Sequence, residues 1–277
     1  MKKLLIVASF LLIACFTFAG GQQEKSEGFS GDYAFGGSTT VEPVALAAIE
    51  VFMEKYPDVN ISYDSQGSSV GVKGAISGTY SLGGASRELK DSEAEQGAKS
   101  IHVGLDGVAV IANKDTVNVS NLSFDEVGLI FAGQITNWKE VGGPDQPIAV
   151  FNRDEASGTR DCFKMTVKPH GGDFVDTAAI VTSNGDMVSK VGSTPYSIGY
   201  CGFGYLAKDP GIKPVSVNGV DPEEANVVNE SYKISRYLNL VYTGELAEGT
   251  LEKAFVDFLL SDDGQAIVAE EKFIPLQ

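Results

Sequence analysis

The sequence is poor in the residues that build metal centres and catalytic dyads. Its 277 residues include three cysteines, two histidines and one tryptophan, and His102 and His170 lie far apart in the chain. No Cys or His spacing matches a metal site. We therefore expect no metal and no cofactor, and we assign both histidines a structural or surface role.

Basic residues are scarce as well. Lysine and arginine number 21 against 37 aspartates and glutamates, which gives a formal net charge of -16. Binding to a nucleic-acid backbone requires a basic face, so we exclude nucleic acid as a partner. The same charge does not exclude a buried anion site, because surface carboxylates beyond roughly 8 Å are screened by salt.

The N-terminus carries a short apolar run rather than a membrane span. Lys2 and Lys3 precede apolar residues 4–18, the pattern of a secretory signal, so we expect an exported, periplasmic or extracytoplasmic protein. Two alternatives stay open: a signal peptide over residues 1–19, or a lipoprotein signal over residues 1–14 with lipidated Cys15. Residues 20–31 are polar and predict a flexible tether.

The other two cysteines, Cys162 and Cys201, fall in a predicted helix and a predicted apolar strand. An oxidising compartment allows them to pair. Burial as two free thiols is the equal alternative.

Short strands alternate with helices along the mature chain. We expect strands at 33–36, 59–63, 107–113, 148–152 and 237–242, and helices at 43–56, 70–77, 123–131 and, as the last one, 251–260. This alternation predicts an α/β fold with mainly parallel sheets covered on both faces. We divide it into lobe I, residues 32–105 plus 240–277, and an inserted lobe II, residues 106–239.

Four glycine- and hydroxyl-rich turns stand where predicted strands give way to helices. They cover residues 36–40, 67–71, 84–87 and 153–160, and they include Ser38, Thr39, Thr40, Ser68, Ser69, Ser86, Ser157, Gly158 and Thr159. Such turns direct free backbone N–H groups and the helix dipole at one point, and Arg87 and Arg153 add forked guanidinium donors. Together they predict a site for a small oxyanion at the carboxyl ends of the strands.

The order of these segments resembles the periplasmic phosphate-binding proteins of high-affinity phosphate ABC transporters. The four turns look like that family's phosphate loops, and supporting segments occur at 106–110, 130–138, 198–200 and 235–236. The resemblance covers almost the whole mature chain. It implies a type II periplasmic-binding-protein fold with a hinge and a central cleft, and a non-enzymatic monomer that carries inorganic phosphate to a membrane permease.

Carried over position by position, the resemblance implies that the anion is held by residues of all four turns. These are Ser38, Thr39, Thr40, Ser68, Ser69, Ser86, Arg87, Arg153, Ser157, Gly158 and Thr159. In the best-known branch the third loop ends in an aspartate that accepts the phosphate proton, whereas this chain has Arg87, as in a Ser-Arg branch. Our candidate acceptor is therefore Asp106, with Asp64 second, and we expect Glu155 to orient Arg153. We expect Arg160, seven residues beyond Arg153 on the body of the predicted helix, to face solvent.

Two other functions compete with phosphate binding. The same fold could bind or sense another oxyanion, such as sulfate or molybdate, since two arginines suit any dianion. A serine hydrolase is the remote alternative, because residues 67–71 fit the G-x-S-x-G turn between a strand and a helix, with His170 as the partner base. That alternative leaves the other three turns unexplained.

Overall fold

A computed structural model of the chain describes residues 28–168 and 173–276. The predicted signal peptide, the lipidation candidate Cys15, the tether up to residue 27 and His170 lie outside these residues. Within the described ranges, no helix combines the length and the apolar character needed to cross a membrane.

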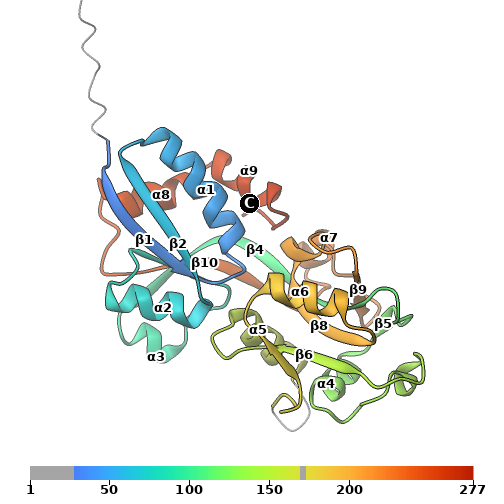
Figure 1. Cartoon of the computed structure of the whole chain (residues 1–277). Coiled ribbons are helices and arrows are strands. Elements are labelled where there is room, and N and C mark those ends of the chain that lie inside the picture. The colour runs from blue at the N-terminus through green and yellow to red at the C-terminus, as the bar shows by residue number, and fades with distance from the viewer. Residues whose placement is uncertain (1–27, 169–172, 277) are drawn as a thin grey trace, which may run out of the picture.

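The chain forms the predicted two-lobed α/β fold (Figure 1). The first lobe contains β1 (Gly31–Gly37), α1 (Glu42–Lys55), β2 (Val59–Ser65), α2 (Ser68–Ser77), β3 (Leu82–Ala85) and α3 (Asp91–Ala94), and the C-terminal α8 (Leu251–Leu260) and α9 (Asp262–Glu270). β1 pairs in parallel with both β2 and β3, so these three strands end at the same edge. The first three glycine-rich turns follow those ends.

The second lobe is built around β6 and β8. Its elements are β5 (Asn121–Leu122), α4 (Phe124–Phe131), η1 (Trp138–Val141), β6 (Ala149–Arg153), α5 (Gly158–Val167), β7 (Ala179–Val181), α6 (Asn184–Ser193), β8 (Ser197–Gly202), η2 (Phe203–Tyr205), β9 (Ile212–Val217) and α7 (Glu224–Val228). β6 pairs in parallel with β7 and β8. Its carboxyl end carries the fourth turn.

Two long strands connect the lobes. β4 (Ala98–Asn113) pairs antiparallel with β10 (Ser235–Thr243) along its first part and with β8 and β9 along its second. The sheet order is β2-β1-β3-β10-β4-β8-β6-β7. The outer strands are parallel, as expected, but the centre is antiparallel. Both predicted lobe crossings, 105/106 and 239/240, fall within these strands, and the boundaries themselves remain a prediction.

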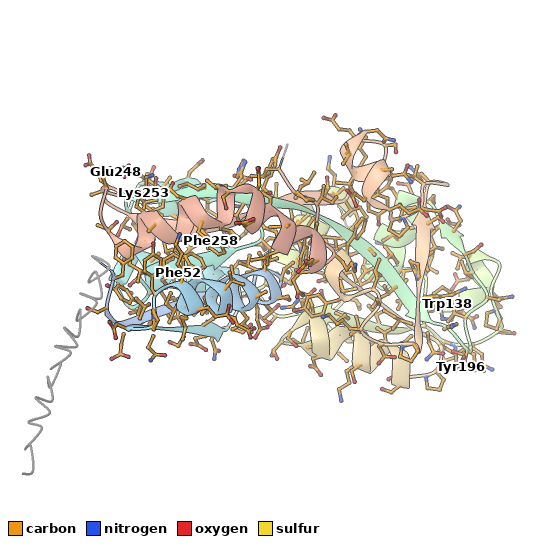
Figure 2. The ribbon with its side chains drawn as sticks, turned by 90° about the horizontal axis from the view of Figure 1, so that it is seen from above. Phe52, Trp138, Tyr196, Glu248, Lys253 and Phe258 are labelled. Carbon is orange, nitrogen blue, oxygen red and sulfur yellow. The ribbon has the colours of Figure 1, made fainter. Side chains whose placement is uncertain are left out.

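Each lobe has aromatic side chains in its core. In the first lobe, Phe52 of α1 packs edge-on against Phe255 of α8, 5.3 Å between ring centroids, and Phe258 lies beside it (Figure 2). In the second, Phe163 of α5 stacks on Tyr200 of β8 at 4.0 Å. This contact packs α5 against β8 and so helps to hold the fourth turn, which opens α5, in place.

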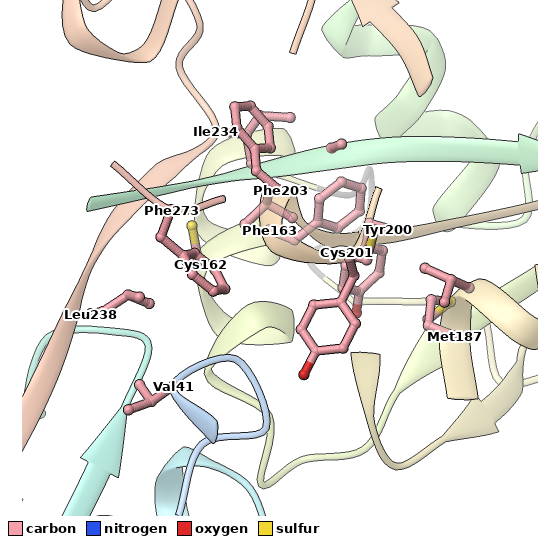
Figure 3. Close-up of a cluster of buried hydrophobic side chains, with 14 of the residues drawn as sticks. Val41, Cys162, Phe163, Met187, Tyr200, Cys201, Phe203, Ile234, Leu238 and Phe273 are labelled. Atoms are coloured by element: carbon pink, nitrogen blue, oxygen red, sulfur yellow. The ribbon is translucent and has the colours of Figure 1, made fainter. Parts of the chain in front are cut away.

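Most predicted elements are confirmed, with two differences. β4 begins nine residues before the predicted 107–113 strand, because residues 98–106 mix apolar residues with polar residues and glycine and so lack the continuous apolar run of the second half. The helix at 251–260 is not the last one: α9 follows it directly, with Ser261 as the N-cap. Cys162 and Cys201 are both buried and free, on α5 and β8 (Figure 3).

Candidate functional site

The first three turns meet at the end of the β1–β3 layer. Ser38 Oγ donates to Ser86 Oγ at 2.9 Å, and Ser68 Oγ lies 3.2 Å from the same Ser86 oxygen. Ser38 Oγ also accepts from the backbone N–H of Thr40 at 3.1 Å, which closes the first turn. These three serines are buried and form one hydroxyl cluster on the first lobe.

The fourth turn faces this cluster from the second lobe. Ser157 is the N-cap of α5 and its Oγ accepts from the Arg160 N–H, leaving the first N–H groups of the helix pointing into the cleft. A Cβ added to Gly158 would lie 2.3 Å from Ser68 Oγ and 2.8 Å from Ser86 Oγ. Only glycine lets the helix N-terminus approach the serines this closely.

Two direct bonds across the cleft show that the lobes are closed on each other. The Ser69 N–H donates to the Ala156 carbonyl oxygen at 3.0 Å. Thr40 Oγ1 and Thr159 Oγ1 share a hydrogen bond of 3.1 Å. Both contacts join one turn of the first lobe to the fourth turn of the second.

The hydroxyl of Thr39 is arranged to donate. Its Oγ1 accepts from Arg153 Nη2 at 3.2 Å and from Asn184 Nδ2 at 3.1 Å. A hydroxyl that accepts two bonds has only its hydrogen left to offer. Thr39 therefore presents an O–H donor, the group that an oxyanion oxygen accepts from.

Two buried arginines converge on the threonine pair. Arg153, at the end of β6 and 1% exposed, also donates from Nη2 to the Thr182 carbonyl oxygen at 2.9 Å. Arg236 of β10 donates from Nη2 to Thr40 Oγ1 at 3.2 Å. Among the described residues, Nε and Nη1 of both arginines have no hydrogen-bond partner. Burial lowers the pKa of Arg153, and the nearby charge of Arg236 lowers it further.

Asp106 is the carboxylate of the site. It is fully buried in β4, its Oδ2 accepts from Arg236 Nη2 at 2.7 Å and its Oδ1 accepts from the Phe203 N–H at 3.0 Å. Burial raises the pKa of Asp106 to about 6, against the opposing effects of Arg236 and of the Phe203 N–H. Each oxygen keeps a second lone pair that can accept a proton donor.

Arg87 and Ser69 lie at the edge of this arrangement. Arg87 Nη1 and Nη2 donate to the two carboxylate oxygens of Glu93 at 2.8 and 2.7 Å, and Nη2 also donates to Ser69 Oγ at 3.2 Å. Arg87 Nε lies 3.1 Å from Asp161 Oδ2. A carboxylate therefore occupies both terminal nitrogens of Arg87. Arg236 bonds a carboxylate through Nη2 alone, and the described hydrogen-bond partners of Arg153 include no carboxylate.

Three acidic or basic side chains differ from their expected settings. Asp64 is exposed and accepts from Tyr80 Oη at 2.6 Å. The Glu155 side chain is 91% exposed and its carboxylate lies 3.9 Å from Arg160 Nη2. Within the described chain it forms no ion pair or hydrogen bond with Arg153, so its expected orienting role is not supported. Arg160, expected to face solvent, is only 15% exposed and its guanidinium lies 5.2 Å from the Phe174 ring centroid.

Sequence reasoning missed Asn184, Arg236 and Tyr205. Asn184 Nδ2 donates to both Thr39 Oγ1 and Thr40 Oγ1, and Tyr205 Oη donates to the Thr39 carbonyl oxygen at 2.6 Å. Asn184 opens α6 directly after Ser183, its N-cap, so it sits in a fifth strand-to-helix turn that the same rule could have found. Arg236 had been noted only as a supporting segment.

The G-x-S-x-G turn lacks the setting of a nucleophile. The central Ser69 Oγ accepts from Arg87, and Ser68 Oγ bonds to Ser86. His102, the imidazole that the structure describes, stacks on Tyr237 with 3.8 Å between centroids and lies 3.4 Å from Glu88. No described imidazole contacts these serines, and within residues 28–168 and 173–276 no acidic, His or Cys cluster is arranged to hold a metal.

Known proteins similar to this chain are binding proteins. Residues 23–263 match the PBP superfamily domain. Phosphate-binding protein PstS of Borreliella burgdorferi is 33% identical over 285 residues, covering 100% of both chains. Phosphate-binding protein PstS of Bacillus subtilis is 36% identical over 295 residues, covering 100% of this chain and 95% of its own.

A solved structure agrees with these relatives. It is a Clostridium perfringens protein described as a phosphate ABC transporter substrate-binding protein with bound phosphate. Its TM-score is 0.84 at 40% identity, covering 89% of this chain and 100% of that one. The two-lobed fold is therefore that of a periplasmic binding protein.

Proposed function

The chain belongs to the PBP superfamily and, within it, to the PstS phosphate-binding proteins, and we propose that it captures inorganic phosphate between its lobes and delivers it to an ABC permease. One observation carries the proposal: the buried Arg153 and Arg236 each keep two nitrogens without a hydrogen-bond partner in the described chain. Buried polar groups are rarely left unpaired, and a guanidinium fork matches an oxyanion.

The remaining donors come from both lobes. The first lobe offers the Thr39 hydroxyl and the serine cluster, and the second offers the N–H groups at the start of α5. We assign anion contact to Ser38, Thr39, Thr40, Ser68, Ser86, Arg153, Ser157, Gly158 and Thr159, with Arg236 and Asn184 added. A dry site lined by these donors strengthens each bond to the anion.

Asp106 supports phosphate over sulfate. Phosphate near neutral pH carries at least one proton and can donate to the free lone pair of the Asp106 carboxylate, whereas sulfate carries none and meets only repulsion. Asp106 is buried beside Arg236, which also contacts Thr40 of the anion site. Asp64 is exposed to water and is the weaker candidate for this role.

Titration calorimetry with phosphate, arsenate, sulfate and molybdate tests the proposal. We expect one phosphate per chain, comparable binding of arsenate because it carries the same protons, and weak binding of sulfate and molybdate. Tighter binding of sulfate or molybdate than of phosphate would show that the protein binds another oxyanion and would contradict the proposed function.

We propose that the mature protein acts outside the cytoplasm as a monomer. Its lobe I would span residues 32–105 plus 240–277, and its lobe II residues 106–239. Mass spectrometry of the exported protein separates cleavage before Gly20 from a lipid-modified Cys15. Stimulation of the ATPase activity of its membrane permease by the phosphate-loaded form tests delivery.

A further inference from the structure

An ion pair between the lobes lies beside the anion site. Arg87 follows β3 in the first lobe and Asp161 belongs to α5 in the second, and Arg87 Nε lies 3.1 Å from Asp161 Oδ2. Lys90 Nζ approaches the same oxygen at 3.5 Å. The Asp161 side chain is 20% exposed and that of Arg87 6%, so the pair is only partly accessible to water.

Arg87 is held in position by its own lobe. Both terminal nitrogens of Arg87 donate to the Glu93 carboxylate, and Glu93 Oε2 also accepts from the Lys90 N–H at 2.9 Å. Burial alone would raise the pKa of Glu93, but the hydrogen bonds from Arg87 and from the Lys90 N–H lower it below its usual value. Glu93 therefore fixes the guanidinium of Arg87 so that its Nε faces Asp161 of the other lobe.

Asp161 is joined to the anion site through the first turn of α5. Its N–H donates to the Ser157 carbonyl oxygen at 3.1 Å, so the residue that caps the anion-binding helix end and the residue that meets Arg87 move as one piece. Opening of the lobes must break the Arg87–Asp161 contact and withdraw the helix N-terminus from the anion together.

We propose that Arg87 and Asp161 form a latch that holds the lobes closed, so that Arg87 sets how long the anion stays bound without contacting it. The latch rests on the phosphate-binding function proposed above. It assigns Arg87 a positioning role, with Glu93 bonded to its terminal nitrogens and Asp161 as the charge partner of its Nε, an atom that has no hydrogen-bond partner among the described residues.

Dissociation kinetics of phosphate test the latch. Asp161→Asn keeps the side-chain shape and removes the charge, and we expect the dissociation rate constant to rise about tenfold while the association rate constant changes by less than about twofold, since such contacts act mainly on dissociation. Asp173→Asn is the matched control. Asp173 pairs at 2.8 Å with Lys164 of α5, the helix that also carries Asp161, and this ion pair lies within the second lobe. Its dissociation rate should equal that of the wild type.

A double-mutant cycle separates the latch from direct contact with the anion. Introduced into the wild-type protein, Arg87→Gln should raise the dissociation rate constant of phosphate. Introduced into Asp161→Asn, it should raise that constant little further, because the two residues act as one unit. Equal effects of Arg87→Gln on both backgrounds would mean that Arg87 binds the anion itself and would overturn the latch.

Two further results keep the test decisive. If Arg87→Gln fails to fold, Lys90→Ala replaces it, because Lys90 is largely exposed and faces the same Asp161 oxygen. Lys90→Ala should raise the dissociation rate by a smaller factor, and it should leave that rate unchanged when Asp161→Asn is already present. Wild-type dissociation in Asp161→Asn, with phosphate still binding one per chain, would refute the latch alone. Absence of phosphate binding by the wild type would refute the proposed function instead.

Discussion

Asp106 and Arg236 face each other across the antiparallel strands β4 and β10, with Asp106 Oδ2 and Arg236 Nη2 2.7 Å apart. Both side chains are almost fully buried where these strands pass between the lobes. Removing one member of such a pair leaves an uncompensated buried charge. Arg236 therefore fixes the orientation of the Asp106 carboxylate and balances its charge.

Asp106→Asn should reduce the selectivity for phosphate, and it should also destabilise the fold because Arg236 loses its buried charge partner. The amide keeps the shape but can donate to sulfate, and phosphate loses a charge-assisted bond. We expect the ratio of phosphate to sulfate affinity to fall by at least about tenfold, equivalent to roughly 1.4 kcal/mol. Calorimetry with both anions measures the ratio.

Asp64→Asn is the control for this change, since Asp64 is exposed and bonded to Tyr80. Its phosphate to sulfate ratio should match that of the wild type. A collapsed ratio in Asp64→Asn with a preserved one in Asp106→Asn would move the acceptor role to Asp64, and preservation in both would leave selectivity to hydroxyl and backbone geometry.

The binding of sulfate should depend on pH through Asp106. Burial raises the pKa of this carboxyl to about 6, so it is ionised and repels sulfate above that pH, and it is protonated and able to donate below it. Sulfate itself stays fully ionised, so its affinity should rise by up to roughly tenfold per unit of pH lost above 6 and then level off. A pH profile that is equally steep in Asp106→Asn would rule out this carboxyl as the cause.

The sequence predicted the turns of the site better than the side chains that complete it. The Gly-Ser-Thr turns and the serine caps are local signals: Ser157 caps α5 and Ser123 caps α4. Arg236 joins the site only because the β4–β10 register sets it opposite Asp106. No short hairpin links these strands, so their pairing could not be derived from spacing.

Charge partners were the least predictable feature. Arg87 stands in a glycine-hydroxyl turn like Arg153, and the sequence treated both as anion ligands. The difference arises from Glu93 and Asp161, which approach Arg87 from a short helix and from the other lobe. Such a distinction depends on tertiary contacts, whereas turn chemistry depends on neighbours in the chain.

Arg153→Ala should weaken phosphate binding strongly. Its guanidinium is buried beside Thr39 with two nitrogens that lack partners among the described residues. Loss of a desolvated, hydrogen-bonded charge at a binding site costs about 2 to 5 kcal/mol. Calorimetry measures the loss.

Arg160→Ala provides the comparison, because Arg160 lies on the same turn-helix segment but packs over Phe174. It should lower the thermal midpoint of unfolding and leave phosphate affinity nearly unchanged. Equal losses of affinity in both variants would show that the anion loop is misplaced.

Phosphate should close the lobes in solution. The groups that we assign to the anion come from both lobes, and the Ser69 N–H donates to the Ala156 carbonyl oxygen across the cleft in the closed form. Small-angle scattering should give a smaller radius of gyration with phosphate than without it. An unchanged radius, with binding verified by calorimetry on the same sample, would contradict capture between the lobes.

Gly158→Ala should separate closure from folding. The added Cβ would lie 2.3 Å from Ser68 Oγ, which belongs to the opposite lobe, so the clash arises only when the cleft closes. Alanine is otherwise favourable in a helix. We therefore expect an unchanged or higher thermal midpoint without phosphate and a phosphate affinity at least about tenfold lower.

The control is Gly185→Ala, in the first turn of α6, where the nearest atoms to an added Cβ lie 3.9 and 4.0 Å away. Wild-type affinity in Gly158→Ala would mean that the lobes bind the anion without approaching as closely as Gly158 and Ser68 do here.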